Sequence, residues 1–195
     1  MIGWSDANWG GDNSTMRSTT GYIFKLGLGP VSWNSKLQPT VALSSCEAEY
    51  MALSSATQEA LWLRSLLKGL GLPYSPTLIY EDNQGAIEMT KNSTIHSRTK
   101  HIGIRYHFFK ERVQLNEMKI EYCHTSQMIA DLFTKALPSA LFKNLVSKLG
   151  MNVTSSEVRG SADSTSDAEG AAPAAQGASQ NEPCKSGAKR GTAYE

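Results

Sequence analysis

The chain has 195 residues, 40% of them hydrophobic, which is enough for one domain with a sizeable core. It carries 19 Lys and Arg against 18 Asp and Glu, which excludes a uniformly basic nucleic-acid-binding protein. Three well-separated cysteines argue against a disulfide scaffold, no apolar run reaches the ~20 residues of a membrane span, and no secretory signal is visible. We therefore expect an intracellular protein, with cytoplasm and nucleus left open.

The first elements are predicted to be three strands. Residues 2–9 alternate apolar and polar side chains and end in a Gly-Gly-Asp-Asn turn. Residues 21–26 are aromatic and β-branched, and after a break at 27–30 the strand pattern resumes over 31–34. Three strands in direct succession predict an antiparallel meander.

A long helix is predicted from Ser44 to about residue 70. Ser44 and Glu47 have the spacing of a capping box, and Gly-Leu-Pro follows the helix. A stripe at helical spacing that includes Glu49, Ala52 and Ala56 would pack closely on a sheet.

Strands then alternate with helices. The patterns predict a strand at 77–80, helices at 83–90 and 98–115, a strand at 118–123, and helices at 126–135 and 139–149. The fold class is therefore α/β, with a mixed sheet flanked by helices.

The composition changes after Gly150. Residues 151–195 are rich in Ala, Gly, Ser, Asp and Glu and contain one aromatic residue, Tyr194. Such a segment has too little apolar surface to offset the entropy of ordering. We expect a domain over residues 1–150 and a disordered low-complexity tail over 151–195.

The charge is unevenly distributed. Residues 1–90 hold five Lys and Arg against eight Asp and Glu, whereas residues 91–150 hold ten against four. An acidic half beside a basic segment suggests metal-binding carboxylates next to a polyanion-binding surface. Chance segregation of solvated charge explains the same counts.

Four acids stand in apolar surroundings, on four different elements. Asp6 lies in the first strand, Glu49 on the helix stripe, Asp82 directly after the fourth strand and Asp131 in a predicted helix. A buried carboxylate needs a partner, and four of them could share a pair of cations. Oxygen ligands favour Mg²⁺ or Mn²⁺ over Zn²⁺. Each acid taken alone is better explained as a surface charge or a helix cap.

Six segments resemble, in order, the ribonuclease H domain of copia-type retrotransposon polyproteins. They are WSDANWGGD (4–12), RSTTGYIF (17–24), VSWNSKLQPTVALSSCEAEYMAL (31–53), EDNQGAI (81–87), HSRTKHIGIRYHF (96–108) and ADLFTK (130–135). The resemblance covers residues 2–150 and excludes the tail.

The resemblance implies a ribonuclease H fold, with a five-stranded mixed sheet of three antiparallel strands followed by parallel strands. It implies hydrolysis of the RNA strand of RNA–DNA hybrids with two Mg²⁺ (or Mn²⁺) ions. The family's catalytic and metal-binding acids fall on Asp6, the EAEY motif, Asp82 and Asp131. The implied partners are an RNA–DNA hybrid and the reverse transcriptase domain of the parent polyprotein.

The EAEY motif offers two glutamates. Glu47 shares a helical face with mixed, fairly polar residues, whereas Glu49 shares one with Ala52 and Ala56, which can pack on the sheet. The broader family pattern Glu-x-x-Ala-Leu also fits Glu49. We assign Glu49 to the site and Glu47 to the helix cap.

A histidine near the last acid is the next candidate. Many ribonucleases H carry a mobile histidine loop there, and His124 precedes Asp131 by seven residues. Its loop is short and lacks glycine, so a proton-shuttle or metal-release role competes with that of a polar residue at a strand end.

Residues 91–112 form a candidate phosphate track. Arg98, Lys100 and Arg105 are the preferred phosphate contacts, and Asn13, Ser14 and Gln84 are candidate polar contacts to the hybrid. A zinc site made of the three histidines in this segment is disfavoured, because their spacing does not suit one helical face.

Two further functions remain open. A catalytically idle nucleic-acid-binding remnant of a polyprotein would keep the fold, although all four acids are present. An integrase or transposase core has a comparable acid trio but does not fit the EAEY and RTKHI motifs.

Overall fold

The structure is a computed structural model that describes residues 1–72, 75–91 and 103–151, with only the backbone described at 103–107. The predicted tail, from residue 152 onward, lies outside the described residues. So does the first part of the helix predicted at 98–115.

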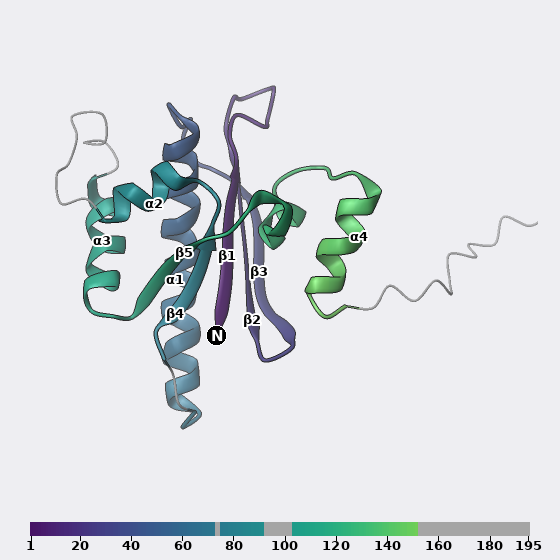
Figure 1. The fold of residues 1–195 in the computed structure, drawn as a ribbon. Helices are drawn as coiled ribbons and strands as arrows, with labels where there is room; N and C mark the ends of the chain where they lie inside the picture. The colour runs from purple at the N-terminus through teal and green to yellow at the C-terminus, as the bar shows by residue number, and fades with distance from the viewer. Residues whose placement is uncertain (73–74, 92–102, 152–195) are drawn as a thin grey trace, which may run out of the picture. The chain divides into compact units, whose positions relative to one another are not determined.

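Five strands form one mixed sheet (Figure 1). They are β1 (Ile2–Asn8), β2 (Thr19–Leu26), β3 (Gly29–Leu37), β4 (Thr77–Glu81) and β5 (Met118–Tyr122), in the spatial order β3-β2-β1-β4-β5. The strands β1, β2 and β3 pair antiparallel, and β1, β4 and β5 pair parallel. The predicted fold class is confirmed, and the third strand is longer than the predicted 31–34.

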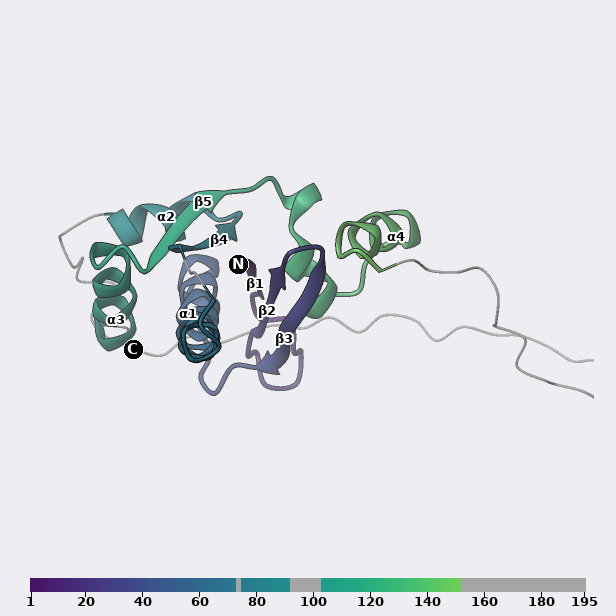
Figure 2. The same cartoon turned by 90° about the horizontal axis from the view of Figure 1, so that it is seen from below.

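Helices cover both faces of the sheet. The long helix α1 (Ser45–Gly69) and α3 (Gly103–Gln114) lie on one face, and α4 (Ser139–Lys148) lies on the other (Figure 2). The short helix α2 (Gln84–Lys91) follows β4 and contacts both α1 and α3.

The main core lies between α1 and the sheet. Ala52, Ala56 and Ala60 of α1 are fully buried, so their small side chains bring the helix close to the strands. Phe24 of β2 is fully buried beneath the helix, and Tyr50 meets Phe109 edge to face at 6.1 Å. Burial of each large side chain contributes roughly 1.5–3 kcal/mol.

The prediction of one helix over residues 126–135 is wrong. The chain forms two short 3-10 helices instead, η2 (Thr125–Gln127) and η3 (Ile129–Phe133). Hydrogen bonds link residues three apart, from Asp131 N–H to Met128 and from Thr134 N–H to Asp131. The tighter winding turns the side chains of Asp131 and Thr134 toward the sheet, so tertiary contacts outweigh helix propensity here.

A second, smaller core holds η3 and α4 against β2. Ile23 packs with Ile129, Leu145 and Leu149. Gly21 of β2 admits η3 at close range, since a Cβ there would lie 2.5 Å from Thr134 Cγ2. In the described part of the chain, no helix has the length and hydropathy needed to cross a membrane.

Candidate metal centre

Three carboxylates from separate elements meet at one edge of the sheet. Asp6 comes from β1, Glu49 from the first turns of α1, and Asp82 directly follows β4. Each offers one oxygen, and these oxygens all lie within 4.8 Å of one another. Because β1 and β4 are neighbouring parallel strands, their carboxyl ends carry Asp6 and Asp82 to the same edge.

Burial and mutual repulsion make this cluster costly to ionise. Desolvation, followed by the nearby charges of Glu81, Asp6 and Asp82, raises the pKa of Glu49 to about 11. Burial also raises the pKa of Asp6, although a hydrogen bond from Thr134 and the charge of Lys135 oppose the increase. The cluster therefore favours either bound protons or a bound cation.

The residues present fit a divalent cation. Glu49 Oε2 is buried and accepts no hydrogen bond within the described residues, so it is free to act as a ligand. The ligand atoms in the cluster are all carboxylate oxygens, which suit a hard cation better than Zn²⁺.

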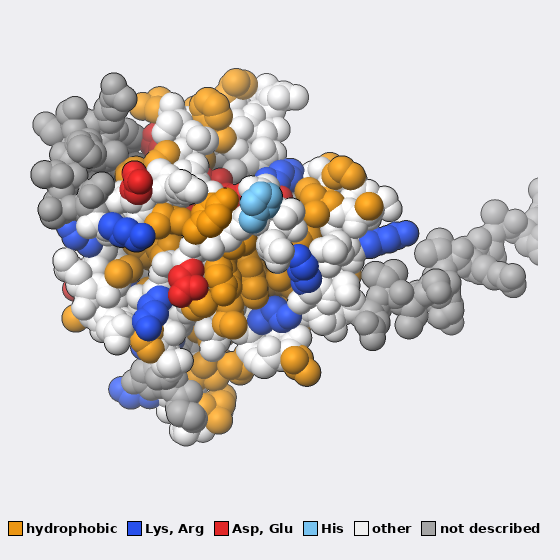
Figure 3. Space-filling view, viewed as in Figure 1, with side chains coloured by type: hydrophobic (Ala, Val, Ile, Leu, Met, Phe, Trp, Pro, Cys, Tyr) orange, Lys and Arg blue, Asp and Glu red, His pale blue; other side chains and the backbone are white. Residues whose placement is uncertain are grey.

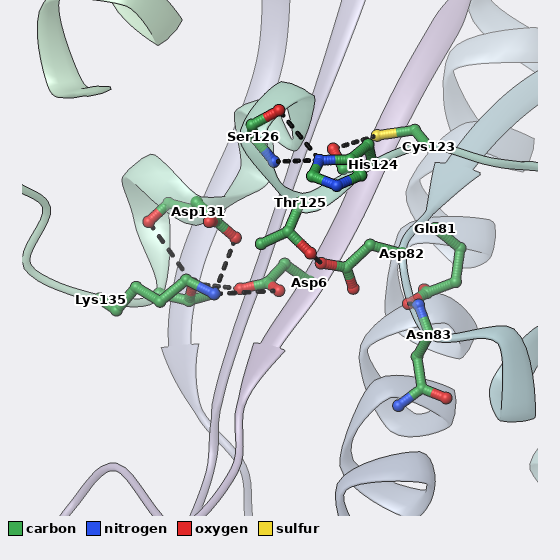
Figure 4. A network of polar contacts seen from close by, with 11 residues as sticks. Asp6, Glu81, Asp82, Asn83, Cys123, His124, Thr125, Ser126, Asp131 and Lys135 are labelled. Atoms are coloured by element: carbon green, nitrogen blue, oxygen red, sulfur yellow. Dashed lines mark hydrogen bonds and ion pairs between the residues drawn. The ribbon is translucent and has the colours of Figure 1, made fainter. Parts of the chain in front are cut away.

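Asp131 is held by a lysine. Its Oδ1 lies 2.9 Å from Lys135 Nζ, and the same ammonium lies 3.6 Å from Asp6 Oδ1 (Figure 4). Burial, followed by the charge of Asp6, raises the pKa of Asp131 to about 6, although Lys135 opposes the increase. We expected four acids around one site. The structure brings oxygens of three within 4.8 Å of one another and places the fourth, Asp131, beside Asp6, where both carboxylates contact Lys135.

Lys135 holds its proton more tightly than an ordinary lysine. Burial lowers its pKa, but the attraction of Asp6 and Asp131 outweighs burial and leaves the pKa above its ordinary value. Sequence reasoning missed this lysine, although it lies four residues after Asp131 in the ADLFTK motif. That spacing could have indicated an ion pair.

Two threonines orient the carboxylates, and neither was predicted. Thr134 Oγ1 donates a hydrogen bond to Asp6 Oδ2, and Thr125 Oγ1 donates one to Asp82 Oδ2 at 2.7 Å. The two contacts join the segment after β5 to β1 and to the end of β4, and Figure 4 shows the contact between Thr125 and Asp82.

Glu81 is a fifth acid that sequence reasoning missed. It is fully buried, and its Oε1 accepts a hydrogen bond from the Asn83 backbone N–H at 3.3 Å. Burial raises its pKa well above the ordinary value. The signal was present in β4, where alternation places Thr77, Ile79 and Glu81 on the buried face.

Glu47 lies at the start of α1, as predicted for a cap. Ser44 Oγ accepts from the Glu47 N–H at 3.1 Å, and a carboxylate oxygen of Glu47 accepts from the Leu43 N–H at 2.8 Å. The carboxylate thus reaches one residue further back than in a standard capping box, where it would meet the Ser44 N–H. Glu49, not Glu47, belongs to the three-carboxylate group.

His124 is exposed and is the N-cap residue that precedes η2. Its Nδ1 accepts a hydrogen bond from the Ser126 N–H at 3.2 Å, which caps the short helix. Nε2 is therefore the nitrogen that carries the proton in the neutral ring. The proposed proton-shuttle role stays a prediction.

The predicted nucleic-acid contacts are only partly described. Arg98 and Lys100 lie outside the described residues, as does the Arg105 side chain. Asn13, Ser14 and Gln84 are exposed, and Ser14 Oγ donates to Asp12 Oδ1 at 2.7 Å within its own turn. Their contacts with a hybrid stay predictions.

The sequence aligns with segments of transposon polyproteins, although no family model matches the chain. It is 41% identical over 152 residues to the retrovirus-related Pol polyprotein from transposon TNT 1-94 of Nicotiana tabacum. It is 43% identical over 149 residues to the corresponding polyprotein from transposon RE1 of Arabidopsis thaliana. The alignments cover 78% and 76% of this chain but only 11% and 10% of those polyproteins.

Solved structures support the fold. LC11-RNase H1, isolated from compost, matches 68% of this chain and 91% of its own, with a TM-score of 0.53 at 11% identity. The same protein in complex with an RNA/DNA hybrid matches with a TM-score of 0.50 at 13% identity, over 68% of this chain and 92% of its own. The chain is thus similar to segments of retrovirus-related Pol polyproteins from transposons and has the ribonuclease H fold.

Proposed function

We propose that the chain is a metal-dependent endonuclease that hydrolyses the RNA strand of RNA–DNA hybrids during retrotransposon reverse transcription. The reverse transcriptase domain of a parent polyprotein is the partner that this role implies. The observation that carries the proposal is the meeting of Asp6, Glu49 and Asp82 at one edge of a ribonuclease H fold.

The proposed cofactors are two Mg²⁺ or Mn²⁺ ions, held by Asp6, Glu49, Asp82 and Asp131. Bound ions of this kind stabilise the attacking and leaving oxygens of a phosphodiester displacement. Thr134 and Thr125 fix the orientations of Asp6 and Asp82, so the carboxylates are positioned before substrate arrives. Lys135 neutralises Asp6 and Asp131 and lowers the local repulsion that a polyanion would meet.

Binding of the hybrid is proposed to use the basic segment. Arg98, Lys100 and Arg105 would contact phosphates, which position the duplex without reading its sequence. Selection of the RNA strand would come from duplex shape and 2′-hydroxyl contacts, for which Asn13, Ser14 and Gln84 are candidates.

The test is a cleavage assay with the full chain. Matched 5′-labelled RNA–DNA hybrid, duplex DNA and duplex RNA are each incubated with Mg²⁺, with Mn²⁺ or with chelator. We expect cleavage of the RNA strand of the hybrid alone, and only with a divalent cation.

The control is the Glu59→Gln variant, which changes an acid of α1 about 15 Å along the helix from Glu49 and keeps an oxygen that can accept from Ser32 Oγ. It should cleave the hybrid as the wild type does. Hybrid binding without cleavage at any divalent concentration would instead support the idle remnant. Cleavage in chelator would contradict the metal-dependent chemistry.

A further inference from the structure

A hollow opens on the sheet face opposite α1, beside the carboxylate cluster. It has a volume of about 680 Å³ and is lined by side chains of β1, β2, β4, η3, α4 and the segment after β5. Figure 3 shows hydrophobic side chains gathered on this face over β1 and β4, with Lys or Arg on both sides and an Asp or Glu at the left edge. We call it the Trp4–Tyr80 hollow, after the two aromatic residues in its lining.

The aromatic residues lie side by side on neighbouring strands. Trp4 of β1 pairs in register with Tyr80 of β4, and their ring centroids are 5.5 Å apart at 32°. Both side chains are partly exposed. They offer aromatic surface on which a planar group can stack.

Two lysines give the hollow a positive charge. Lys25 Nζ donates to the Lys148 carbonyl at 2.6 Å, and Lys148 Nζ donates to Gln127 Oε1 at 3.2 Å. Neither ammonium forms an ion pair with a carboxylate in the described part of the chain, and the described residues that line the hollow include no Asp or Glu. Exposed Glu121 of β5 pairs in register with Tyr80 and lies on the same face beside the hollow. The positive charge is therefore on the β2 and α4 side of the hollow, where Lys25 and Lys148 can contact phosphates.

The hollow adjoins the proposed catalytic site. Trp4 and Tyr80 precede Asp6 and Asp82 by two residues each, on parallel strands, which places each ring about 7 Å along its strand from the acid. A second link runs through the segment after β5: His124 lines the hollow, and the next residue, Thr125, donates a hydrogen bond to Asp82. A strand that leaves the acid cluster across this face would enter the hollow.

We propose that the Trp4–Tyr80 hollow binds an unpaired segment of single-stranded nucleic acid, with bases stacked on Trp4 and Tyr80 and phosphates on Lys25 and Lys148. Aromatic side chains flanked by cations are the general means of binding single strands, whose base faces are accessible. A duplex hides those faces within its own stack. A protein partner fits less well, because interface cores are depleted in lysine.

The binding itself does not require the proposed nuclease activity. Only the further step, that the segment is an overhang of the cleaved hybrid, rests on the proposed function. Binding is therefore measured with single strands in chelator. Failure of the chain to cleave a hybrid can then be distinguished from failure of the hollow to bind a single strand.

The experiment measures the affinity of the full chain for labelled oligo(U) and oligo(dT) across a salt series. Lys25→Gln/Lys148→Gln should weaken binding at least about tenfold and reduce the salt slope by about 1.4, because each phosphate that a lysine neutralises on a single strand adds ~0.7 to that slope. The matched control, Lys68→Gln/Lys143→Gln, removes the same charge from exposed positions outside the hollow, on α1 and α4, and should leave affinity unchanged. The two oligonucleotides show whether RNA or DNA is preferred.

Two variants of Tyr80 distinguish the contribution of base stacking from that of charge. Tyr80→Leu should weaken binding several-fold with an unchanged salt slope, whereas Tyr80→Phe keeps the ring and should bind like the wild type. Thermal melting of each variant shows whether it is folded. Equal losses in the Lys25/Lys148 variant and its control, equal affinity of the two Tyr80 variants, or no binding of either oligonucleotide would overturn the proposal.

Discussion

Lys135 Nζ lies 2.9 Å from Asp131 Oδ1, so the fourth acid of the proposed site is neutralised by a residue of its own segment. The same ammonium lies 3.6 Å from Asp6, and its side chain is 33% exposed. Lys135 thereby links the acid on η3 to the acid on β1. In the metal-free protein it offsets part of the repulsion within the cluster.

Lys135→Met should therefore destabilise the metal-free protein. Loss of the ammonium leaves Asp6 and Asp131 buried without a cation, at a cost of about 1–2 kcal/mol after allowance for the partial exposure of Lys135. We expect a lower melting temperature in chelator, and a larger rise on addition of Mg²⁺ than in the wild type. Lys119→Met, at an exposed position, is the control. Equal melting temperatures of the two variants in chelator would show that the ion pairs contribute nothing.

The two glutamates of the EAEY motif should differ sharply. Glu49→Gln removes a charge from the three-carboxylate group and should reduce hybrid cleavage by at least about 10²-fold, because divalent ions bind carboxylates far better than amides. It should also stabilise the metal-free protein near neutral pH, because burial beside Glu81 and Asp6 forces Glu49 to take up a proton on folding, and a neutral Gln avoids that cost.

Glu47→Gln is the matched control, because its amide oxygen can still accept from the Leu43 N–H. It should cleave at the wild-type rate. Parallel rate and melting measurements on both variants decide the assignment, and a larger loss in Glu47→Gln would reverse it.

The stability of the metal-free protein should depend on pH through Asp131. Its pKa is raised from 3.8 to about 6 in the folded state, so the folded protein holds this proton more tightly than the unfolded chain. The resulting stabilisation is fully present below about pH 3.8 and is lost as the pH rises through about 6. Asp131→Asn lacks this dependence. The difference in urea midpoint between wild type and variant, measured in chelator, should fall over that window and then level off. A difference that grows with pH would contradict the argument.

Gly21→Ala tests how η3 is positioned. The new Cβ would lie 2.5 Å from Thr134 Cγ2 and 3.1 Å from the Ala130 carbonyl, so η3 must move away from β2. We expect a loss of about 1–3 kcal/mol in the free energy of unfolding and slower cleavage, because Asp131 and Thr134 move with η3. Gly29→Ala is the control, since its Cβ meets no atom within 4 Å. Urea denaturation of both variants measures the effect. Equal free energies of unfolding would show that η3 can move away from β2 without loss of stability.

The sequence predicted much of this fold because local patterns and tertiary structure agree along most of the chain. Alternation in β1 and the small-residue stripe of α1 each indicate both the element and its buried face. The segment at 126–135 was predicted wrongly because its conformation depends on distant partners: Thr134 bonds to Asp6 and packs against Gly21. Helical propensity carries no information about those contacts.

The candidate site was predictable where an acid interrupts an apolar pattern. Asp6, Glu49 and Asp82 all do so, and the structure brings their oxygens together. The roles of Lys135 and Thr125 could not be read in the same way, because common surface residues acquire a role only through the three-dimensional approach of their segments. The alternation in β4 could have predicted that Glu81 is buried, but the site was assigned to the neighbouring Asp82.

The most direct measurement is the rate at which the full chain hydrolyses the RNA strand of an RNA–DNA hybrid at saturating Mg²⁺, compared between the wild type and Asp82→Asn. This substitution removes one charge from the carboxylate group and keeps an oxygen that can accept from Thr125. We predict cleavage by the wild type and a rate at least about 10²-fold lower in the folded variant. Equal rates in the two proteins, or no cleavage by the wild type, would contradict the proposed metal-dependent hydrolysis.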